Sequence, residues 1–300
     1  MNQKYLITSS NGKENSLMIK IVCDSSTLYS SDEAKEKGFE AIPLQVIIDG
    51  HSYNDYEELT PVQMIEKCRN GAVPHTSQPN PARKLEVYNE LLENPQNQIL
   101  DLCLADGLSG TYQSACAVKE MCTDPERVTV FNTRTLCGPH RAMVQTAQKM
   151  AEENGSLEEI LSVLEIMQKN EASALMVKDF GFLQRGGRIS KTTAFAGSLL
   201  KLVPVVCKRE DGTSLDLVGA SRTFQKGFEK VLNFLQEHGF DEKWRLYIVH
   251  ADAPVQAKKA LAWFQERFPS LDTEIHELCP MFIAHGGPGC IALQAIRVPD

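Results

Sequence analysis

Residues 98–115, QILDLCLADGLSGTYQSA, contain the pattern on which the predicted fold depends. The first eight residues form a mostly apolar run of the length that is typical of a buried strand. A short segment of glycine and hydroxyl residues follows, and a helix is predicted from Thr111 onward. The stretch therefore predicts one strand, one polar loop and one helix, which together are the repeating unit of α/β proteins.

The same alternation continues along the rest of the chain. Strands are predicted at 19–24 and 41–48 and in the segments VTVF, SALMV, LVPVVC, SLDLV, LYIVHA, TEIHEL and CIALQAI. Helices are predicted at 81–92, 140–153, 223–237 and 254–267, and capping boxes at Thr60 and Ser156 predict two further helix starts. Strands that alternate with helices of about 10–15 residues predict two packed α/β domains with largely parallel sheets.

The length of 300 residues corresponds to about two domains. We predict a polar N-terminal extension at 1–17, an N-terminal α/β domain at 18–170 and a C-terminal α/β domain at 171–300. Ligands of open α/β sheets bind beyond the carboxyl ends of the strands, where loops meet helix N-termini. We therefore expect a binding site in the loops between the predicted elements.

The chain carries 31 Lys+Arg and 39 Asp+Glu, so its formal net charge is −8. It has no dense basic cluster, which argues against a nucleic-acid-binding surface. No uncharged apolar run approaches the length of about 18 residues that a membrane-spanning helix needs, and the first residues lack the apolar core of a secretory signal. These features predict a cytoplasmic protein without stable membrane insertion.

Nine cysteines occur without any Cys-x-x-Cys pair, and most of them lie in apolar runs. An odd number of cysteines without a secretory signal argues against a disulfide framework. No group of Cys and His has the spacing of zinc ligands. We therefore expect buried, reduced thiols and no metal site.

Two loops combine small hydroxyl residues with a following helix. Thr76 and Ser77 lie in the segment TSQP, and Ser109, Gly110 and Thr111 lie in the segment LSGT. Backbone N–H groups and hydroxyls at a helix start can bind a carboxylate or phosphate, and a glycine lets the ligand come close to the backbone. The alternative is ordinary helix capping, in which the hydroxyls satisfy only the N–H groups of the helix. The sequence leaves both interpretations open.

His285 precedes Gly-Gly-Pro-Gly, a segment in which few side chains would block a ligand. A histidine there could complete a carboxylate site as a neutral donor or as a cation, and a purely structural histidine is the alternative. Arg185 and Arg188 flank a glycine pair in the segment QRGGR. They could contact the carboxylate, a partner protein or only solvent.

Several catalytic and nucleotide-binding motifs are absent from the sequence. Ser109 is followed directly by Gly110, so the segment GLSGT lacks the G-x-S-x-G spacing of a hydrolase nucleophile. No G-x-x-x-x-G-K-[ST] segment occurs and no glycine-rich turn follows the first strand, which argues against binding of ATP or NAD. We therefore expect a binding protein without a cofactor, and a hydrolase that uses Ser109 is the disfavoured alternative.

Seven segments in this order resemble the DegV family of bacterial fatty-acid-binding proteins. They are DSS from Asp24, IPLQVIIDGHSYNDYEEL from Ile42, TSQP at 76–79, LSGTYQSA at 108–115, FLQRGGRIS at 182–190, SLLKLVPVV at 198–206 and HGGPG at 285–289. Each segment alone is weakly specific, whereas their order and spacing over nearly the whole chain are specific.

The resemblance implies that one long-chain fatty acid is held between the two domains. Loops of the N-terminal domain and His285 would bind its carboxylate through Thr76, Ser77, Ser109, Gly110, Thr111 and His285, with Arg185 and Arg188 as contacts to the carboxylate or to a partner. The acyl chain would occupy a tunnel in the C-terminal domain. Candidate lining residues, with ordinary core residues as the alternative, are Phe180, Phe182, Phe195, Leu199 and Leu200.

Some members of the family present the bound fatty acid to a separate, dihydroxyacetone-kinase-like ATP-binding protein. That partner phosphorylates the carboxylate, and the acyl phosphate enters phospholipid synthesis. The resemblance thus implies a fatty-acid-binding subunit of a fatty acid kinase. The alternative is a lipid sensor or storage protein without a kinase partner.

Asp106 and Val203 are among the residues that depart from the pattern that is usual in the family. Asp106 precedes LSGT at a position where a serine is usual, and its charge would repel a bound carboxylate unless the side chain points away. Val203 replaces the lysine that usually precedes Pro204. We expect the fold to tolerate both changes, which leave the preferred chain length and the coupling to a kinase open.

Overall fold

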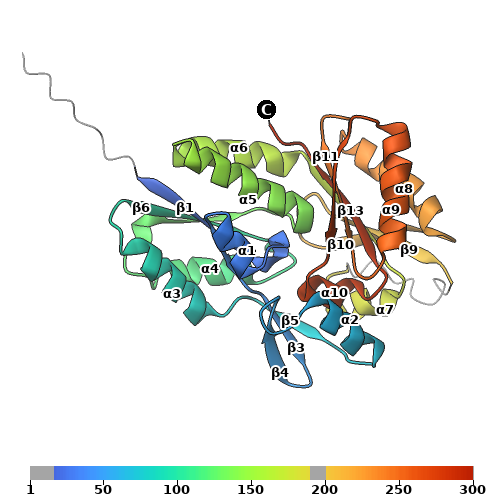
Figure 1. The fold of residues 1–300 in the computed structure, drawn as a ribbon, viewed down its shortest axis with the longest axis horizontal. Coiled ribbons are helices and arrows are strands. Elements are labelled where there is room, and N and C mark those ends of the chain that lie inside the picture. The colour runs from blue at the N-terminus through green and yellow to red at the C-terminus, as the bar shows by residue number, and fades with distance from the viewer. Residues whose placement is uncertain (1–16, 190–200, 300) are drawn as a thin grey trace, which may run out of the picture.

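The structure is a computed structural model that describes residues 17–189 and 201–299. Two large sheets lie side by side along its long axis, one from each half of the chain, and a small third sheet lies next to their junction (Figure 1). The α/β class that the sequence predicts is confirmed.

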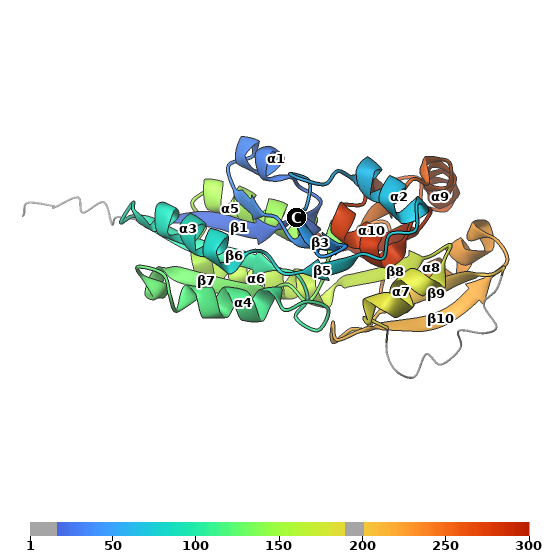
Figure 2. The same cartoon turned by 90° about the horizontal axis from the view of Figure 1, so that it is seen from below.

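The first large sheet is fully parallel, as the alternation of strands and helices predicts. Its strands, in order across the sheet, are β2 (Glu40–Ile42), β1 (Met18–Asp24), β6 (Asn97–Cys103) and β7 (Val128–Asn132). The helices α3 (Pro81–Leu92) and α4 (Thr111–Lys119) cover one face. The other face is covered by α1 (Ser31–Glu36), α5 (Cys137–Glu152) and α6 (Leu157–Lys169) (Figure 2). Short 3-10 turns are η1 (Ser25–Thr27) and η2 (Pro125–Arg127).

Both predicted capping boxes are present. Thr60 accepts the backbone N–H of Gln63 at the start of α2 (Pro61–Arg69), and the Gln63 side chain accepts the N–H of Thr60. Ser156 and Glu159 make the same reciprocal pair at the start of α6. These bonds satisfy N–H groups that have no partner within the helix, which is why both helices begin where the sequence predicts.

The second large sheet differs from the prediction of largely parallel sheets. Its order is β10 (Leu215–Ser221), β9 (Val203–Lys208), β8 (Glu171–Met176), β13 (Ile291–Ile296), β11 (Arg245–His250) and β12 (Asp272–Glu277). Only β11 and β12 pair in parallel, and the other four pairings are antiparallel. The physical reason is that β9 and β10 form a hairpin and β13 inserts between β8 and β11, so the strand direction does not follow from the order of elements. The helices α8 (Phe224–Glu237) and α9 (Pro254–Arg267) cover one face.

The predicted single strand at 41–48 is two strands in different sheets. β2 ends at Ile42 in the parallel sheet, and β3 (Gln45–Ile48) joins an antiparallel sheet with β4 (His51–Asn54) and β5 (His75–Ser77). Pro43 lies between them and has no N–H to continue a ladder. The break carries the chain toward the C-terminal half, where β3 and β5 contact α10 (Pro280–Gly286), which also packs against α2 and α7 (Phe180–Gly186).

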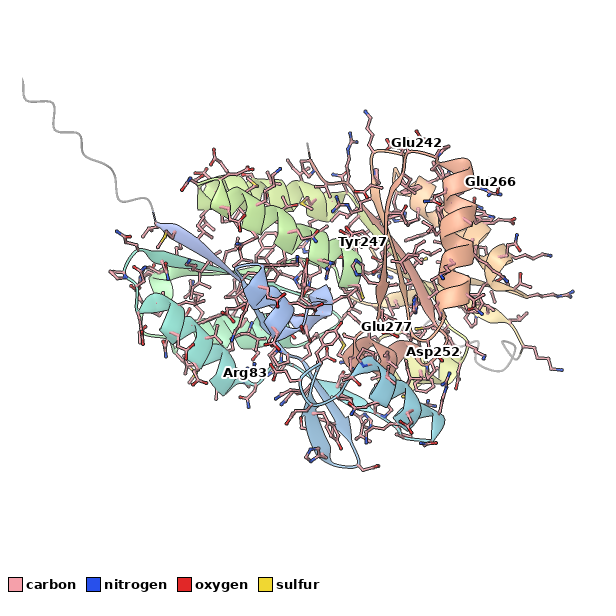
Figure 3. All side chains as sticks on the ribbon, viewed as in Figure 1. Arg83, Glu242, Tyr247, Asp252, Glu266 and Glu277 are labelled. Carbon is pink, nitrogen blue, oxygen red and sulfur yellow. The ribbon has the colours of Figure 1, made fainter. Side chains whose placement is uncertain are left out.

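One apolar cluster extends through both halves of the chain. It includes Ile21 of β1, Met143 of α5, Val206 of β9 and Ile283 of α10. Tyr247 on β11 points toward α5 (Figure 3), and its ring lies so close to the backbone there that a Cβ at Gly138 would be 2.2 Å from Tyr247 Cγ. The chain passes from the first large sheet to the second between α6, which ends at Lys169, and β8, which begins at Glu171. None of the helices in the described ranges is long and apolar enough to cross a membrane.

Candidate functional site

A cavity of about 290 Å³ lies where the two large sheets and the small third sheet meet. Residues from both halves of the chain line it, and most of them are apolar, including Leu104, Leu136, Leu175, Leu183, Val206 and Phe282. Small-molecule pockets commonly enclose about 300–1,000 Å³, so the cavity has the size and character of a site for a small apolar ligand.

One part of the wall brings the two hydroxyl loops and His285 together. Thr76 on β5, Ser109 before α4 and His285 on α10 all line the cavity, with Ser77 and Gly110 next to them. The Thr76 hydroxyl oxygen lies 3.0 Å from Nε2 of His285. His285 belongs to the last turn of α10 and not to the loop that its glycine-rich surroundings suggest, because α10 continues to Gly286 before Gly287 turns the chain at φ 73°.

His285 is a neutral donor or acceptor in this structure. Burial lowers its pKa from the usual 6.5 to about 3, and the positive charge of Arg188 acts in the same direction. With the ring proton on Nε2, His285 donates to Thr76 Oγ1, and the hydroxyl proton of Thr76 is then available to an acceptor in the cavity. Gly186 permits this placement of the ring, because a Cβ at position 186 would lie 2.4 Å from His285 Nδ1.

The LSGT loop holds Ser109 at the cavity wall through Thr111. Ser109 Oγ lies 2.8 Å from Thr111 Oγ1, and it also accepts the backbone N–H of Thr111 at 3.3 Å. Thr111 is fully buried and is not a lining residue, so it orients Ser109. Gly110 lets the TSQP and LSGT loops approach each other, because a Cβ there would lie 2.9 Å from Gln78 Oε1. Ser109 therefore makes a capping contact and borders the cavity as well.

The two arginines of QRGGR have different surroundings. Arg188 lines the cavity and donates to the carbonyl oxygens of Leu108 and Gly186 at 3.1 and 2.6 Å. Desolvation lowers its pKa, but arginine keeps its charge at neutral pH, so Arg188 supplies a positive charge beside the hydroxyls. Arg185 is exposed on α7 and stacks on the Phe182 ring at 4.8 Å from the ring centre.

Of the residues expected to line an acyl tunnel, the structure describes only Phe180 and Phe182. Phe180 and Phe182 are buried on α7 but do not line the cavity, and Phe182 packs against Gly287 instead. Phe195, Leu199 and Leu200 lie outside the described residues. Leucines, Met281 and Phe282 form most of the apolar wall, and no sequence signal distinguishes them from ordinary core residues.

Asp106 and Val203 lie in different surroundings. Asp106 is half-buried and does not line the cavity. It borders an adjoining surface depression that shares Leu108, Ser109, Gly110 and Arg188 with the cavity wall. Val203 begins β9 and packs against the core on the side of α8 and α9.

Besides Gln78 of the TSQP segment, three polar residues line the cavity that the sequence analysis did not single out. They are Ser173 on β8, Lys208 on β9 and Gln294 on β13. A signal for them exists in the sequence, because each is a polar residue within or at the end of an apolar strand segment that predicts complete burial. Propensity alone does not show that their side chains lie on one face of one sheet.

The cavity wall does not resemble a hydrolase site. In the described part of the chain Ser109 Oγ bonds to Thr111 and has no histidine within hydrogen-bond distance. Ser26 does bond to a histidine, His140, at 2.8 Å, but both residues are fully buried outside the cavity. Among residues 17–189 and 201–299, no three His, Cys, Asp or Glu side chains are grouped so that they could hold a metal ion.

Comparison with known proteins relates this fold and cavity to one family. The family model described as "Uncharacterised protein, DegV family" matches residues 18–298. A DegV domain-containing protein of Listeria innocua is 30% identical over 278 residues, which are 92% of this chain and 97% of that protein.

Two solved structures give the same result. A DegV family protein from Thermus thermophilus, described by its fatty acid binding, is 32% identical with a TM-score of 0.83 over 94% of this chain and 100% of the other. DegV from Bacillus subtilis, described as a fatty acid binding protein, is 26% identical with a TM-score of 0.81 over 94% of this chain and 100% of the other.

Proposed function

Because this chain belongs to the DegV family, we propose that it binds one long-chain fatty acid in the cavity between its two large sheets. The observation that supports the proposal most directly is the composition of the cavity wall. An apolar surface continues into a cluster of Thr76, Ser109 and neutral His285, with the charge of Arg188 beside them. Such a wall suits a ligand that is apolar along most of its length and anionic at one end.

In this proposal the carboxylate binds at the hydroxyl cluster and the acyl chain lies along the leucine-rich wall. Thr76, Ser77 and Ser109 donate hydroxyl protons, Gly110 lets the ligand approach the backbone, and Thr111 holds Ser109 in place. Burial of one methylene contributes about 0.8 kcal/mol, so a chain of about 15 contributes roughly 10 kcal/mol before the costs of binding. The acyl chain therefore supplies affinity, and the polar cluster fixes orientation.

The bound carboxylate is then presented to a separate ATP-binding protein of the dihydroxyacetone-kinase type, which forms an acyl phosphate for phospholipid synthesis in the cytoplasm. This chain has no P-loop or dinucleotide motif, so the nucleotide must come with the partner. The exposed Arg185 is available to contact that partner, whereas Arg188 faces the ligand. In this role the chain is a substrate-presenting subunit and does not itself catalyse the transfer.

Mass spectrometry of lipid extracted from the purified protein tests the binding. We expect a long-chain fatty acid at close to one molecule per chain. A protein that carries no fatty acid, and that takes up none after delipidation and incubation with palmitate, would contradict the proposal.

Adding ATP and a fatty acid kinase to the loaded protein tests presentation. Hydroxylamine trapping should detect acyl phosphate only when protein, kinase and ATP are all present. Thr76→Val should reduce the yield, and Thr129→Val, the same exchange on β7 away from the cavity, should not. Tight fatty-acid binding without acyl phosphate would instead favour a lipid sensor or storage protein.

A further inference from the structure

A polar row crosses the face of the second large sheet that borders the cavity. Leu175 on β8 pairs with Val206 on β9 and with Ala292 on β13, and these three apolar residues line the cavity together. Two residues further along each strand, on the same face, the lining residues are Ser173, Lys208 and Gln294. The cavity wall therefore changes from apolar to polar within one step of the strand pleat.

This row lies on the far side of the apolar row from the proposed carboxylate site. His285 belongs to α10, and the neighbouring Gly286 lies close to the Leu175 side chain. A two-residue step along a strand is about 7 Å. Ser173 is two residues further from this end of β8 than Leu175, so an acyl chain that starts at His285 passes the apolar row before it reaches the polar one.

The polar row contains a buried ion pair. Lys208 Nζ lies 2.6 Å from Glu171 Oε1, and both side chains are at most 3% exposed. Glu171 Oε2 also accepts the hydroxyls of Thr135 and Ser173 at 3.1 and 3.3 Å. The carboxylate is thus well satisfied, and it balances the charge of the lysine.

The row also has hydrogen-bonding capacity beyond these contacts. A lysine ammonium has three N–H donors, and the oxygen partners of Lys208 in the described ranges are Glu171 Oε1 and the carbonyl of Arg209 at 3.0 Å. Gln294 Oε1 accepts the N–H of Gly138, and its Nε2 donates to Ser173 Oγ at 3.2 Å and to the carbonyl oxygen of Leu136 at 3.5 Å. A methylene chain packed against this wall offers no acceptor to the third N–H of Lys208. The loss of a hydrogen bond to water would then weaken binding of an unsubstituted acyl chain.

We propose that this wall is a subsite for a neutral oxygen on the acyl chain, so that the preferred ligands are hydroxy or oxo fatty acids. The inference rests on the proposed function, which places the carboxylate at the Thr76 end. A hydroxyl or keto oxygen accepts the donor of Lys208, and a hydroxyl also donates to Ser173 or Gln294. A second carboxylate is disfavoured because Glu171 already neutralises the lysine.

Displacement of a fluorescent fatty acid from the delipidated full-length protein tests the subsite. The ligands are hexadecanoic acid, hexadecanoic acids with one hydroxyl at positions from 2 to the terminal carbon, and unsubstituted acids of shorter chain. We expect at least one hydroxylated acid with the hydroxyl beyond the middle of the chain to bind about tenfold more tightly than hexadecanoic acid. The 2-hydroxy acid, whose hydroxyl stays near the carboxylate, should show no such gain.

Two variants locate the effect. Lys208→Met with Glu171→Gln removes both charges at once and leaves an acceptor for Thr135, and it should abolish the preference for the hydroxylated acid. The matched control is Lys84→Met with Asp101→Asn, which makes the same type of exchange at a buried pair away from the cavity. A smaller exchange, Ser173→Ala, should weaken the preference about threefold, and its control is Ser221→Ala, a buried serine that does not line the cavity.

The possible outcomes separate this inference from the proposed function. If hexadecanoic acid binds and no hydroxylated acid binds more tightly, the subsite is refuted and the fatty-acid-binding role stands. Tighter binding of shorter unsubstituted acids would also refute it, because the wall would then act as a stop for the chain. If neither class binds, the proposed function itself fails. The comparison of ligands on the unmodified protein decides the question even if a variant does not fold.

Discussion

Two lysines of this protein are buried beside a carboxylate, and their surroundings differ. Lys84 on α3 pairs with Asp101 on β6 inside the parallel half, where Tyr88 also donates to Asp101 and neither partner of the pair lines the cavity. Lys208 pairs with Glu171 at the wall of the cavity. The same chemistry is thus enclosed in one half and borders the cavity in the other.

The comparison teaches that burial by itself does not identify a binding group. A buried ion pair with complete packing around it mainly affects whether the fold forms, because removal of one partner leaves an uncompensated charge. A pair that borders a cavity can also exchange hydrogen bonds with a ligand or with water. The expected consequence is that polar residues of the enclosed kind change stability, whereas those at the cavity change binding.

The largest effect is expected for Lys84→Met. It should lower the free energy of unfolding by about 3–5 kcal/mol, because Asp101 remains buried without its cation. Urea denaturation measures this. Lys208→Met should cost less, since Glu171 keeps the Thr135 and Ser173 hydroxyls and the cavity has room for water. If both variants lose the same free energy of unfolding, the cavity does not reduce the cost of removing one partner of the ion pair.

Gly186→Ala should reduce fatty-acid affinity on the order of tenfold without a comparable loss of stability. The new Cβ would lie 2.4 Å from His285 Nδ1 and would displace the ring from Thr76. The matched control is Gly181→Ala in the same helix, whose Cβ would have side-chain atoms of Arg185 and Asp179 as its nearest neighbours. Isothermal titration with palmitate compares the two variants. Equal palmitate affinities of Gly186→Ala and Gly181→Ala would contradict a role of His285 in the binding site.

Ser109→Ala should weaken fatty-acid binding about fivefold, which corresponds to the roughly 1 kcal/mol that one hydrogen bond contributes. Ser114→Ala serves as the control, since Ser114 lies on α4 and does not line the cavity. Both variants should retain the thermal midpoint of the parent within a few degrees. If Ser109 acts only as a helix cap, the midpoint falls and the affinity does not change.

A further effect concerns the dependence of stability on pH. The folded protein keeps His285 neutral down to about pH 3, whereas the unfolded chain protonates this histidine near 6.5. The unfolded state therefore binds more protons in this window, and the His285 contribution to stability is lost as the pH falls from 6.5 toward 3. Asp55 has a pKa raised to about 6 by burial and contributes with the opposite sign between about 6 and 3.8. The difference between the parent and His285→Gln in urea denaturation at several pH values isolates the histidine, and parallel curves would contradict the assignment.

Local signals in the sequence predicted a large part of the fold. The capping residues at Thr60 and Ser156, and the apolar runs of β1 and β6, each depend on a few adjacent residues, and the structure has these elements where they were expected. Strand direction in the second sheet was not predictable in this way. It depends on which strands become neighbours, as when β13, the last strand of the chain, inserts between β8 and β11.

The candidate site divides in the same manner. Hydroxyl residues next to glycine and a histidine before a glycine run have a local chemical signature, so Thr76, Ser109 and His285 could be named from the sequence. Apolar lining residues such as Leu136 and Leu183 look like any core residue, because a cavity differs from a packed core only in what is missing between side chains.

The sequence by itself determined the α/β class, the hydroxyl loops, the family and the lack of a nucleotide motif, because each of these features depends on residues that are adjacent in the chain. The tertiary structure decided that Thr76 meets His285, that Arg188 and not Arg185 faces the cavity, and that Ser173, Lys208 and Gln294 form one row. These facts depend on contacts between residues far apart in the chain. Such contacts are fixed by the packing of whole elements, and no local propensity contains them.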